Sequence, residues 1–351
     1  MSAEFTRALR ESGAAPSDGS PLHFGDPAAE LRASLESCAL IDRSSLCRML
    51  ASGPDLLDLL HRLSTGDVKD LTEGQGRPTV LTSAKGRIVE RLFVHHLGAD
   101  GVLLVGRPEG GTRVLDHLTR YTFAEKTGLS EITDETVLLA LTGPRAAAAL
   151  GAVAPPPRRL QNQNARIAGV PVRTLGHDGL ATDGFSVVAP RDRAAAVWRE
   201  LTGAVLGVGG RPAGDQASEA SRILRGVPAP GHELSGEHNP LEAGLHEAIS
   251  FDKGCYVGQE VVARLDTYDK VARTLVGLRF ATDAAPAGTD LYHAGRRIGS
   301  VSSSVVPPGF CHGVGLAIVK HRGLADDALL ALGSPEGETV TRVGLPFDEA
   351  R

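Results

Sequence analysis

The sequence predicts an α+β fold built from two related α+β domains and a small C-terminal β-barrel. A strand followed by a leucine-rich helix, over residues 46–63, returns as a strand and an alanine-rich helix over residues 136–153. Such repetition is typical of two similar halves that pack together. Residues 271–347 instead hold short apolar runs separated by glycine and proline, which predicts a small barrel. The predicted units are a mobile N-terminus over residues 1–20, α+β domains over residues 21–135 and 136–270, and the barrel over residues 271–351.

The first half is expected to open with a capped helix. Residues 1–20 are rich in Ser, Gly, Ala and Pro, and we expect them to be mobile. Asp26 followed by Pro27 is a signature of a helix start, because an aspartate side chain can cap free backbone N–H groups and proline suits the first helical position. A strand is expected over residues 46–50, in which Cys47 packs among apolar neighbours.

The rest of the first half predicts a helix, a hairpin, a strand and a second helix. The first of these helices begins at Pro54, and two strand-like runs about a turn at Lys85 and Gly86 predict the hairpin. A strand at residues 102–106 and a helix at residues 112–127 follow. Four residues of this last helix are expected to face inward: Val114, Leu115, Leu118 and Tyr121.

The second half repeats this alternation. Strands are expected within residues 165–175 and at residues 185–190, separated by the loop GHDGLATDGF. A helix at residues 194–206 contains the only tryptophan, Trp198. A shorter helix is expected to begin at Ser218 and to end before a glycine.

Composition excludes several classes of function. Apolar residues make up 42% of the chain and charged residues 23%, which are values of folded globular proteins. The net charge of −5, without a basic run, argues against direct nucleic-acid binding. No window reaches the roughly 18 apolar residues of a membrane helix and the N-terminus resembles no signal peptide, so we expect no membrane contact and a cytoplasmic location. The four cysteines lie far apart without metal-ligand spacing, so no metal site is expected.

The densest group of reactive residues is FDKGCYVGQEVVARL, at residues 251–265. A tight turn over residues 253–258 is expected to open into a short helix. Cys255 would then lie ahead of a helix and two residues after Lys253, where backbone N–H groups and an ammonium group favour the thiolate. The same donors suit an anionic ligand. From the residues alone, the interpretation of Cys255 as a buried apolar filler is equally good.

The string KGCYVGQE resembles the signature of the YgfZ family, which comprises folate-binding relatives of the glycine-cleavage T-protein that support iron–sulfur proteins. The resemblance implies binding of tetrahydrofolate or a one-carbon derivative, and a role in assembly or repair of iron–sulfur enzymes, tRNA-modifying enzymes among them. It implies assembly factors or client enzymes as partners, and Cys255 as a reactive thiol assisted by Lys253. The implied folate pocket is bordered by Lys253, Gly254, Cys255, Tyr256, Gln259 and Glu260.

Other segments resemble the T-protein superfamily, which implies an aminomethyltransferase-like fold. The loop GHDGLATDGF matches a segment whose acidic residue binds the pterin ring, a task that suits a carboxylate because it can accept two hydrogen bonds. The resemblance makes Asp183 the candidate and Asp178 the alternative, whereas without it both are ordinary aspartates of Asp–Gly turns. Arg222 occupies the position of an arginine near the folate site, with Arg225 as the alternative.

The resemblance also raises an alternative function, that of an aminomethyltransferase or folate-dependent demethylase of the T-protein type. The T-protein carries two aspartates on the second strand of the hairpin, one of which assists methylene transfer. The matching residues here are Glu90 and Arg91. Acid–base catalysis requires reach to the reacting atom, so this exchange counts against the transferase. A scaffold that kept the fold and lost the ligand is a third interpretation.

Overall fold

The computed structural model describes residues 3–16, 19–177, 184–320 and 324–348. The chain divides into two compact units. The first comprises Met1–Thr82, Val89–Ser218 and Glu247–Val257, and the second comprises Ser83–Ile88, Glu219–His246 and Gly258–Arg351. Each unit is therefore assembled from segments that are distant in the sequence.

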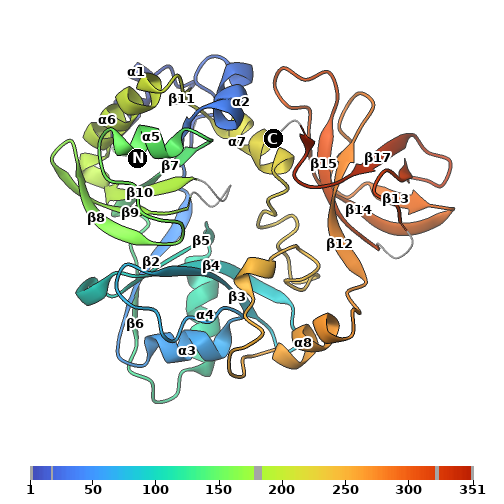
Figure 1. Cartoon of the computed structure of the whole chain (residues 1–351), viewed down its shortest axis with the longest axis horizontal. Coiled ribbons are helices and arrows are strands. Elements are labelled where there is room, and N and C mark those ends of the chain that lie inside the picture. Colours follow the sequence, from blue (N-terminus) through green and yellow to red (C-terminus); the bar gives the residue numbers. More distant parts are fainter. Residues whose placement is uncertain (1–2, 17–18, 178–183, 321–323, 349–351) are drawn as a thin grey trace. The chain divides into compact units, whose positions relative to one another are not determined.

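The first unit contains two sheets (Figure 1). In the six-stranded sheet, the strand β1 pairs in parallel with β11 and antiparallel with β7. The six-stranded sheet has the order β11 (Arg211–Pro212), β1 (Ala39–Asp42), β7 (Thr136–Thr142), β10 (Phe185–Pro190), β9 (Val170–Leu175) and β8 (Asn162–Ile167). The five-stranded sheet has the order β3 (Gly76–Thr82), β4 (Ile88–His96), β5 (Val102–Pro108), β2 (Leu46–Ser52) and β6 (Gly128–Glu131).

The two sheets pack face to face, and helices cover their outer faces. On β7, Val137 and Leu139 belong to the core beneath the helices, whereas Leu138 belongs to the core between the sheets. On β5, Leu104 faces the helices and Leu103 faces the other sheet. Successive side chains of a strand point to opposite faces, so a strand that is apolar throughout serves two cores. The unit therefore has four layers, helix, sheet, sheet and helix (Figure 1).

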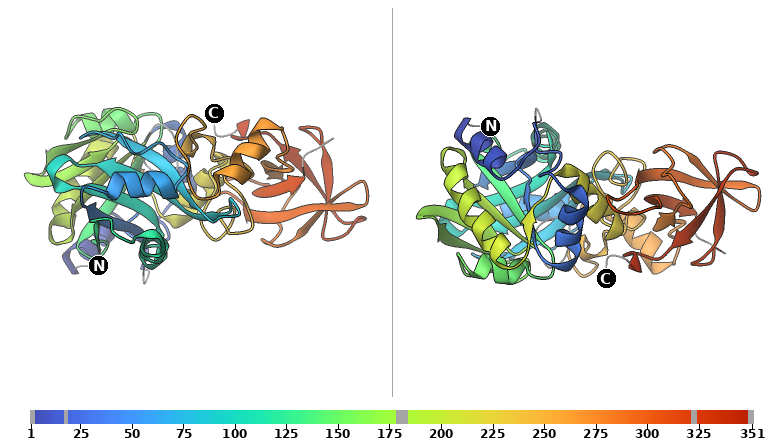
Figure 2. Two further views of the ribbon diagram at one scale, coloured as in Figure 1. Left: turned by 90° about the horizontal axis from the view of Figure 1, so that it is seen from below. Right: turned by 90° about the horizontal axis from the view of Figure 1, so that it is seen from above.

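Each outer face is covered by its own helices. On the six-stranded sheet, α1 lies beside α6 (Figures 1 and 2), and the buried Trp198 of α6 contacts the rings of Phe5 and Phe24. The helices of the first unit and its connections are α1 (Ala3–Glu11), α2 (Pro27–Glu36), α3 (Leu56–Leu63), η1 (Gly98–Asp100), α4 (Gly111–Tyr121), α5 (Ala146–Gly151), η2 (Arg191–Arg193) and α6 (Ala194–Gly207).

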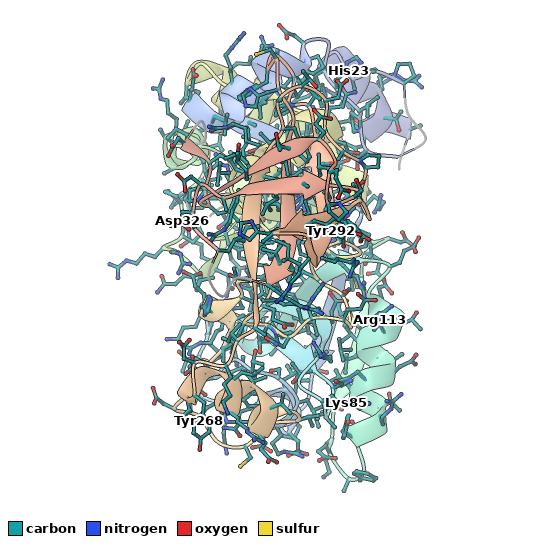
Figure 3. All side chains as sticks on the ribbon, turned by 90° about the vertical axis from the view of Figure 1, so that its right-hand side faces the viewer. His23, Lys85, Arg113, Tyr268, Tyr292 and Asp326 are labelled. Carbon is teal, nitrogen blue, oxygen red and sulfur yellow. The ribbon has the colours of Figure 1, made fainter. Side chains whose placement is uncertain are left out.

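The second unit contains a closed six-stranded barrel with a core of its own around Leu278, Leu291 and Leu330. Tyr292 on β13 and Tyr268 at the end of α8 are labelled in Figure 3. The barrel order is β12 (Arg273–Arg279), β15 (Val314–Lys320), β14 (Arg296–Val305), β13 (Asp290–His293), β16 (Leu329–Leu332) and β17 (Thr339–Val343). The remaining helices are α7 (Asp215–Leu224), η3 (His246–Ala248) and α8 (Gln259–Thr267).

The predicted α+β class with a C-terminal barrel is confirmed. The predicted helix start is also found, because the Asp26 carboxylate accepts a hydrogen bond from the backbone N–H of Ala29 at 3.0 Å. The boundaries expected at residues 135 and 270 stay predictions. No helix in the described part of the chain is both long enough and apolar enough to cross a membrane.

Several local expectations differ from the structure. The helix expected over residues 112–127 ends at Tyr121, and the helix expected to begin at Ser218 begins at Asp215. Residues 1–20 were expected to be mobile, whereas Ala3–Glu11 forms α1 and buries Phe5 and Leu9, because these apolar side chains share one helical face. On α4, Leu115 is 45% exposed and does not face inward, because the helix buries the stripe that contains Val114 and Leu118.

Candidate functional site

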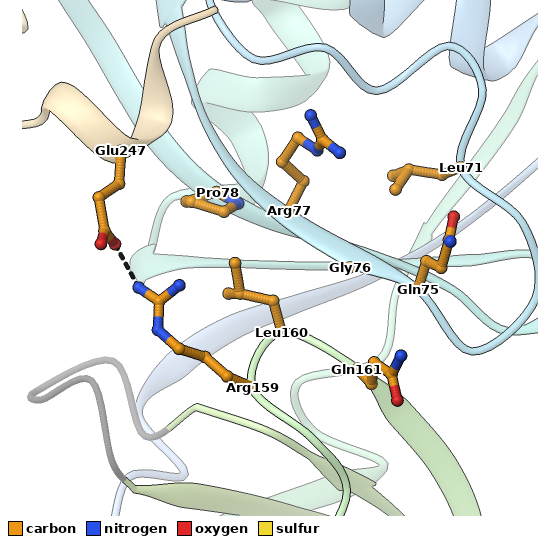
Figure 4. Close-up of a pocket in the computed structure, with 9 residues that line it drawn as sticks. All are labelled: Leu71, Gln75, Gly76, Arg77, Pro78, Arg159, Leu160, Gln161 and Glu247. Carbon is orange, nitrogen blue, oxygen red and sulfur yellow. Dashed lines mark hydrogen bonds and ion pairs between the residues drawn. The ribbon is translucent and has the colours of Figure 1, made fainter.

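A cavity of about 380 Å³ lies in the first unit, between the start of β3 and the turn that precedes β8 (Figure 4). Its volume is within the range of cofactor and small-molecule sites. Three apolar side chains, those of Leu71, Pro78 and Leu160, provide surface for a flat ring. The complete lining is Leu71, Gln75, Gly76, Arg77, Pro78, Arg159, Leu160, Gln161 and Glu247.

The backbone of both walls is tightly constrained. Leu160 adopts a left-handed conformation with φ of +60°, which is uncommon for a bulky residue and is often retained at functional sites. Gly176 accepts a hydrogen bond from the backbone N–H of Leu160 at 2.9 Å and donates one to the carbonyl of Gln161 at 2.7 Å. On the other wall, a side chain at Gly76 would clash, because a Cβ atom there would lie 2.3 Å from Nδ1 of His95.

The cavity carries charge at its rim. The guanidinium of Arg159 is ion-paired with the carboxylate of Glu247 across the opening (Figure 4). Arg77 is exposed at the same rim. Arginine binds carboxylates through paired N–H groups, so two arginines beside an apolar floor suit a ligand with a flat ring and an anionic tail.

Lys253 is buried in a cage of carbonyl groups. Its Nζ donates hydrogen bonds to the carbonyls of His61, Ser64 and Gly66 at 2.5, 2.7 and 2.9 Å. Nζ also lies 5.1 Å from the centre of the Tyr256 ring. Burial lowers the pKa of Lys253 to about 8, so the ammonium form, with three N–H donors, prevails at neutral pH.

These contacts anchor the segment that carries the predicted thiol. The carbonyl of Val257 accepts a hydrogen bond from Oγ1 of Thr82 at 2.5 Å, and its N–H donates to the carbonyl of Arg62 at 3.1 Å. Cys255 lies within this anchored segment and is exposed. All three N–H groups of Lys253 point at carbonyls, so they do not donate to the Cys255 sulfur in this arrangement. Assistance of the thiol by Lys253 stays a prediction.

The four cysteines are expected to differ sharply in reactivity. Cys255 and Cys311 are exposed, whereas Cys38 and Cys47 are buried. Burial and then the nearby Glu131 carboxylate raise the pKa of Cys47 to about 11, which disfavours its nucleophilic form. Iodoacetamide at pH 7.5, followed by peptide mass mapping, should modify the two exposed cysteines in the folded protein and the two buried ones only after unfolding. Rapid native labelling of Cys47 would contradict this ranking.

Glu90 and Arg91 lie on opposite sides of β4. Glu90 is buried and its carboxylate pairs with Arg107 Nε at 2.6 Å, next to the start of α4. Burial raises the pKa of Glu90, and Arg107 opposes that shift. The Arg91 guanidinium lies 5.4 Å from the ring of Phe93, on the face toward the other sheet. The strand thus presents a cation, not a carboxylate, on the face between the sheets.

Three of the other predicted site residues, Arg222, Gln259 and Glu260, belong to the second unit. Arg222 is buried in the second unit, where its guanidinium binds the carboxylates of Glu219 and Glu233 and the carbonyl of Val227. Gln259 and Glu260 form the first turn of α8. Asp183 and Asp178 lie outside the described residues. Among the described residues that line the cavity, none is a predicted site residue, and these assignments therefore stay predictions.

Comparison with known proteins identifies the family. A family model described as the GCVT N-terminal domain matches residues 16–253. The chain belongs to the GCVT N-terminal domain family. A chloroplastic protein of Arabidopsis thaliana, provisionally named a transferase, is 34% identical to this member over 82% of the chain and 66% of its own length. The aminomethyltransferase of Symbiobacterium thermophilum is 30% identical over 85% of this chain and 83% of its own.

A solved structure supports the same fold for this GCVT family member. The glycine cleavage system aminomethyltransferase T from Bartonella henselae superposes with a TM-score of 0.82 and 23% identity. The alignment covers 99% of this chain and 98% of that one. The predicted T-protein-like fold is thereby confirmed. The narrower resemblance to the YgfZ family stays a prediction.

Sequence reasoning missed the cavity residues and the residues behind them. Arg159 lies in a proline- and arginine-rich stretch that reads as an ordinary loop. His95 lies on a strand, and its contact is with His177, 82 residues away, so nothing near it in the sequence indicates the pair. The left-handed backbone of Leu160 could not be predicted from the sequence, because glycine or asparagine is the residue usually found in that conformation. Only Gly76 carries a usable signal, a glycine at the start of a predicted strand.

Proposed function

We propose that this protein binds tetrahydrofolate, or a one-carbon derivative, in the cavity between β3 and the turn before β8. We further propose that it is an accessory protein of the YgfZ type, which supports assembly or repair of iron–sulfur enzymes, with tRNA-modifying enzymes among the candidate clients. Its partners would be those enzymes or their assembly factors. A cytoplasmic location remains an expectation from the sequence.

The chemistry of folate matches the cavity. A pterin is a flat ring that can lie against Leu71, Pro78 and Leu160, while a glutamate tail carries carboxylates that Arg77 and Arg159 can bind. The exchange of Glu247 for a ligand carboxylate would keep Arg159 paired. Asp183 stays our candidate for the pterin edge on the strength of the resemblance. Arg222 and the KGCYVGQE residues do not line this cavity, and their proposed role in folate binding rests on the resemblance alone.

One observation favours the accessory role over the aminomethyltransferase. The carboxylate of Glu90 is buried against Arg107, and Arg91 occupies the strand face toward the other sheet. A general acid must reach the reacting nitrogen, and Glu90 is turned away from that face. The alternative would be supported by release of ammonia and methylenetetrahydrofolate from an aminomethyl-lipoyl carrier protein, and we expect none.

Calorimetric titration with tetrahydrofolate under anaerobic conditions tests the binding proposal. Replacing Arg159 or Arg77 with glutamine should weaken binding about tenfold each, because an exposed charge-assisted hydrogen bond is lost. Arg166→Gln is the matched control, since Arg166 is exposed on β8 and does not line the cavity. Absence of binding to the wild-type protein would contradict both folate functions, and an equal loss in the Arg166 variant would contradict the assignment to this cavity.

A further inference from the structure

Two buried histidines form a direct pair in the first unit. Nε2 of His95 on β4 lies 2.7 Å from Nε2 of His177, which follows β9. The two rings are nearly parallel, at 5°, and the ring of Phe93 stacks on His177 with centroids 4.0 Å apart. His95 is 0% exposed and His177 is 5% exposed. The Nδ1 atoms of both rings are buried without a hydrogen-bond partner among the described residues.

The pair connects the two walls of the cavity. On one side, His95 packs directly beneath Gly76, where even a methyl group would lie 2.3 Å from Nδ1. On the other side, His177 follows Gly176, whose N–H and carbonyl hold Gln161 and Leu160. An unbroken chain of contacts therefore runs from the β3 wall, through both imidazoles, to the turn before β8.

We propose that the His95–His177 pair is the positioning element of this cavity: as a neutral pair that shares one proton, it holds the two walls at the separation that reduced folate requires. The inference rests on the proposed function for its ligand. It adds that the two walls stay together only while both histidines are neutral. Protonation of the pair at low pH should therefore let the walls move apart. Neither histidine is required to touch the ligand.

The physical reason lies in the number of protons. With one proton between the facing nitrogens, one Nε2 donates and the other accepts. A second proton makes both nitrogens donors and breaks the bond. The described charged side chains that face the pair are cationic, namely Arg91, Arg159 and Arg173, so they also oppose protonation.

The sign of the pH dependence follows from the pKa shifts. Burial lowers the pKa of His95 to about 3 and that of His177 well below its ordinary value. The open arrangement, with solvated histidines near pKa 6.5, binds more protons than the closed one as pH falls below 6.5. Closing is therefore fully favoured above that pH and is weakened as pH falls. Between pH 7.5 and 5.5 the closed-to-open ratio should fall about tenfold for each histidine that titrates only when open.

Amide hydrogen exchange measures that ratio without any ligand. The N–H groups of Leu160 and Gly176 bond across the turn, so their protection factors report opening of this wall. After correction for intrinsic exchange, wild-type protection should fall about tenfold to a hundredfold from pH 7.5 to 5.5. His95→Phe combined with His177→Phe should abolish this pH dependence of the protection factors, which we call the slope. His95→Gln, which keeps a hydrogen-bonding side chain but cannot titrate, should retain protection at pH 7.5 and lose part of the slope.

The matched control is His117→Phe. His117 on α4 is 7% exposed and its pKa is also lowered by burial, but it does not line this cavity. It should leave the slope unchanged. If His117→Phe flattens the slope as strongly as the paired variants do, the slope reports global unfolding and the inference is overturned. A flat wild-type profile overturns it as well.

Folate titration separates this inference from the proposed function. At pH 7.5, His95→Gln should bind tetrahydrofolate nearly as tightly as the wild type, whereas His95→Ala should bind about fivefold to a hundredfold more weakly. Wild-type affinity in His95→Ala, with the fold intact, overturns the positioning role. Absence of folate binding by the wild type overturns the proposed function alone, because the protection factors still decide whether the pair holds the walls.

Discussion

Replacing Lys253 with methionine is expected to lower the free energy of unfolding by about 3 kcal/mol. The ammonium donates to three carbonyls, two of which belong to the buried residues Ser64 and Gly66. Methionine keeps the length of the side chain but has none of the donors. Three carbonyl groups would lose their partner together, and a buried acceptor without one is costly. Urea unfolding measures the change, provided that the dependence of the free energy of unfolding on urea concentration is the same in both variants.

Lys69→Met is the matched control for this effect. Lys69 is 54% exposed and pairs with Asp58 on the surface at 3.2 Å. Exposed ion pairs contribute about 0 to 1 kcal/mol, so this variant should be nearly as stable as the wild type. Equal stability of the two variants would mean that the carbonyl cage contributes little, and that the hydrogen bonds of Val257 with Thr82 and Arg62 anchor the segment before α8.

Replacing Cys255 with serine is expected to abolish support of iron–sulfur enzymes in cells that lack the native protein, while folding stays intact. The thiol is exposed, so its loss leaves no cavity, and serine retains the size but lacks a nucleophilic thiolate. The measurement is the activity of an iron–sulfur enzyme in complemented cells, with protein levels checked in parallel.

Cys311→Ser tests whether the effect belongs to this thiol. Cys311 is the other described exposed cysteine and lies in the second unit, so it controls for general loss of a surface thiol. We expect full support from this variant. Full support from Cys255→Ser as well would remove the thiol from the mechanism and leave folate binding as the activity to explain.

The sequence alone determined the class of fold, because that class depends on local patterns. Asp26 and Pro27 mark the start of α2, and the turn at Gly86, with φ of +65°, joins β3 and β4 as the hairpin pattern predicts. The short runs after residue 271 form the closed barrel. Helix caps, turns and strand alternation depend on residues that are consecutive in the chain, so the sequence predicts them.

Only the tertiary structure decided which side chains meet. Glu90 and Arg91 are adjacent in the sequence, yet strand geometry sends one to α4 and the other to the face between the sheets. His95 finds His177 across 82 residues, and Lys253 finds the carbonyl of Gly66 across 187. Every residue has a backbone carbonyl, so the residue type does not indicate which carbonyl will accept a hydrogen bond from a buried lysine. Such partners are set by the packing of distant segments, where burial makes each polar group find whichever partner lies within reach.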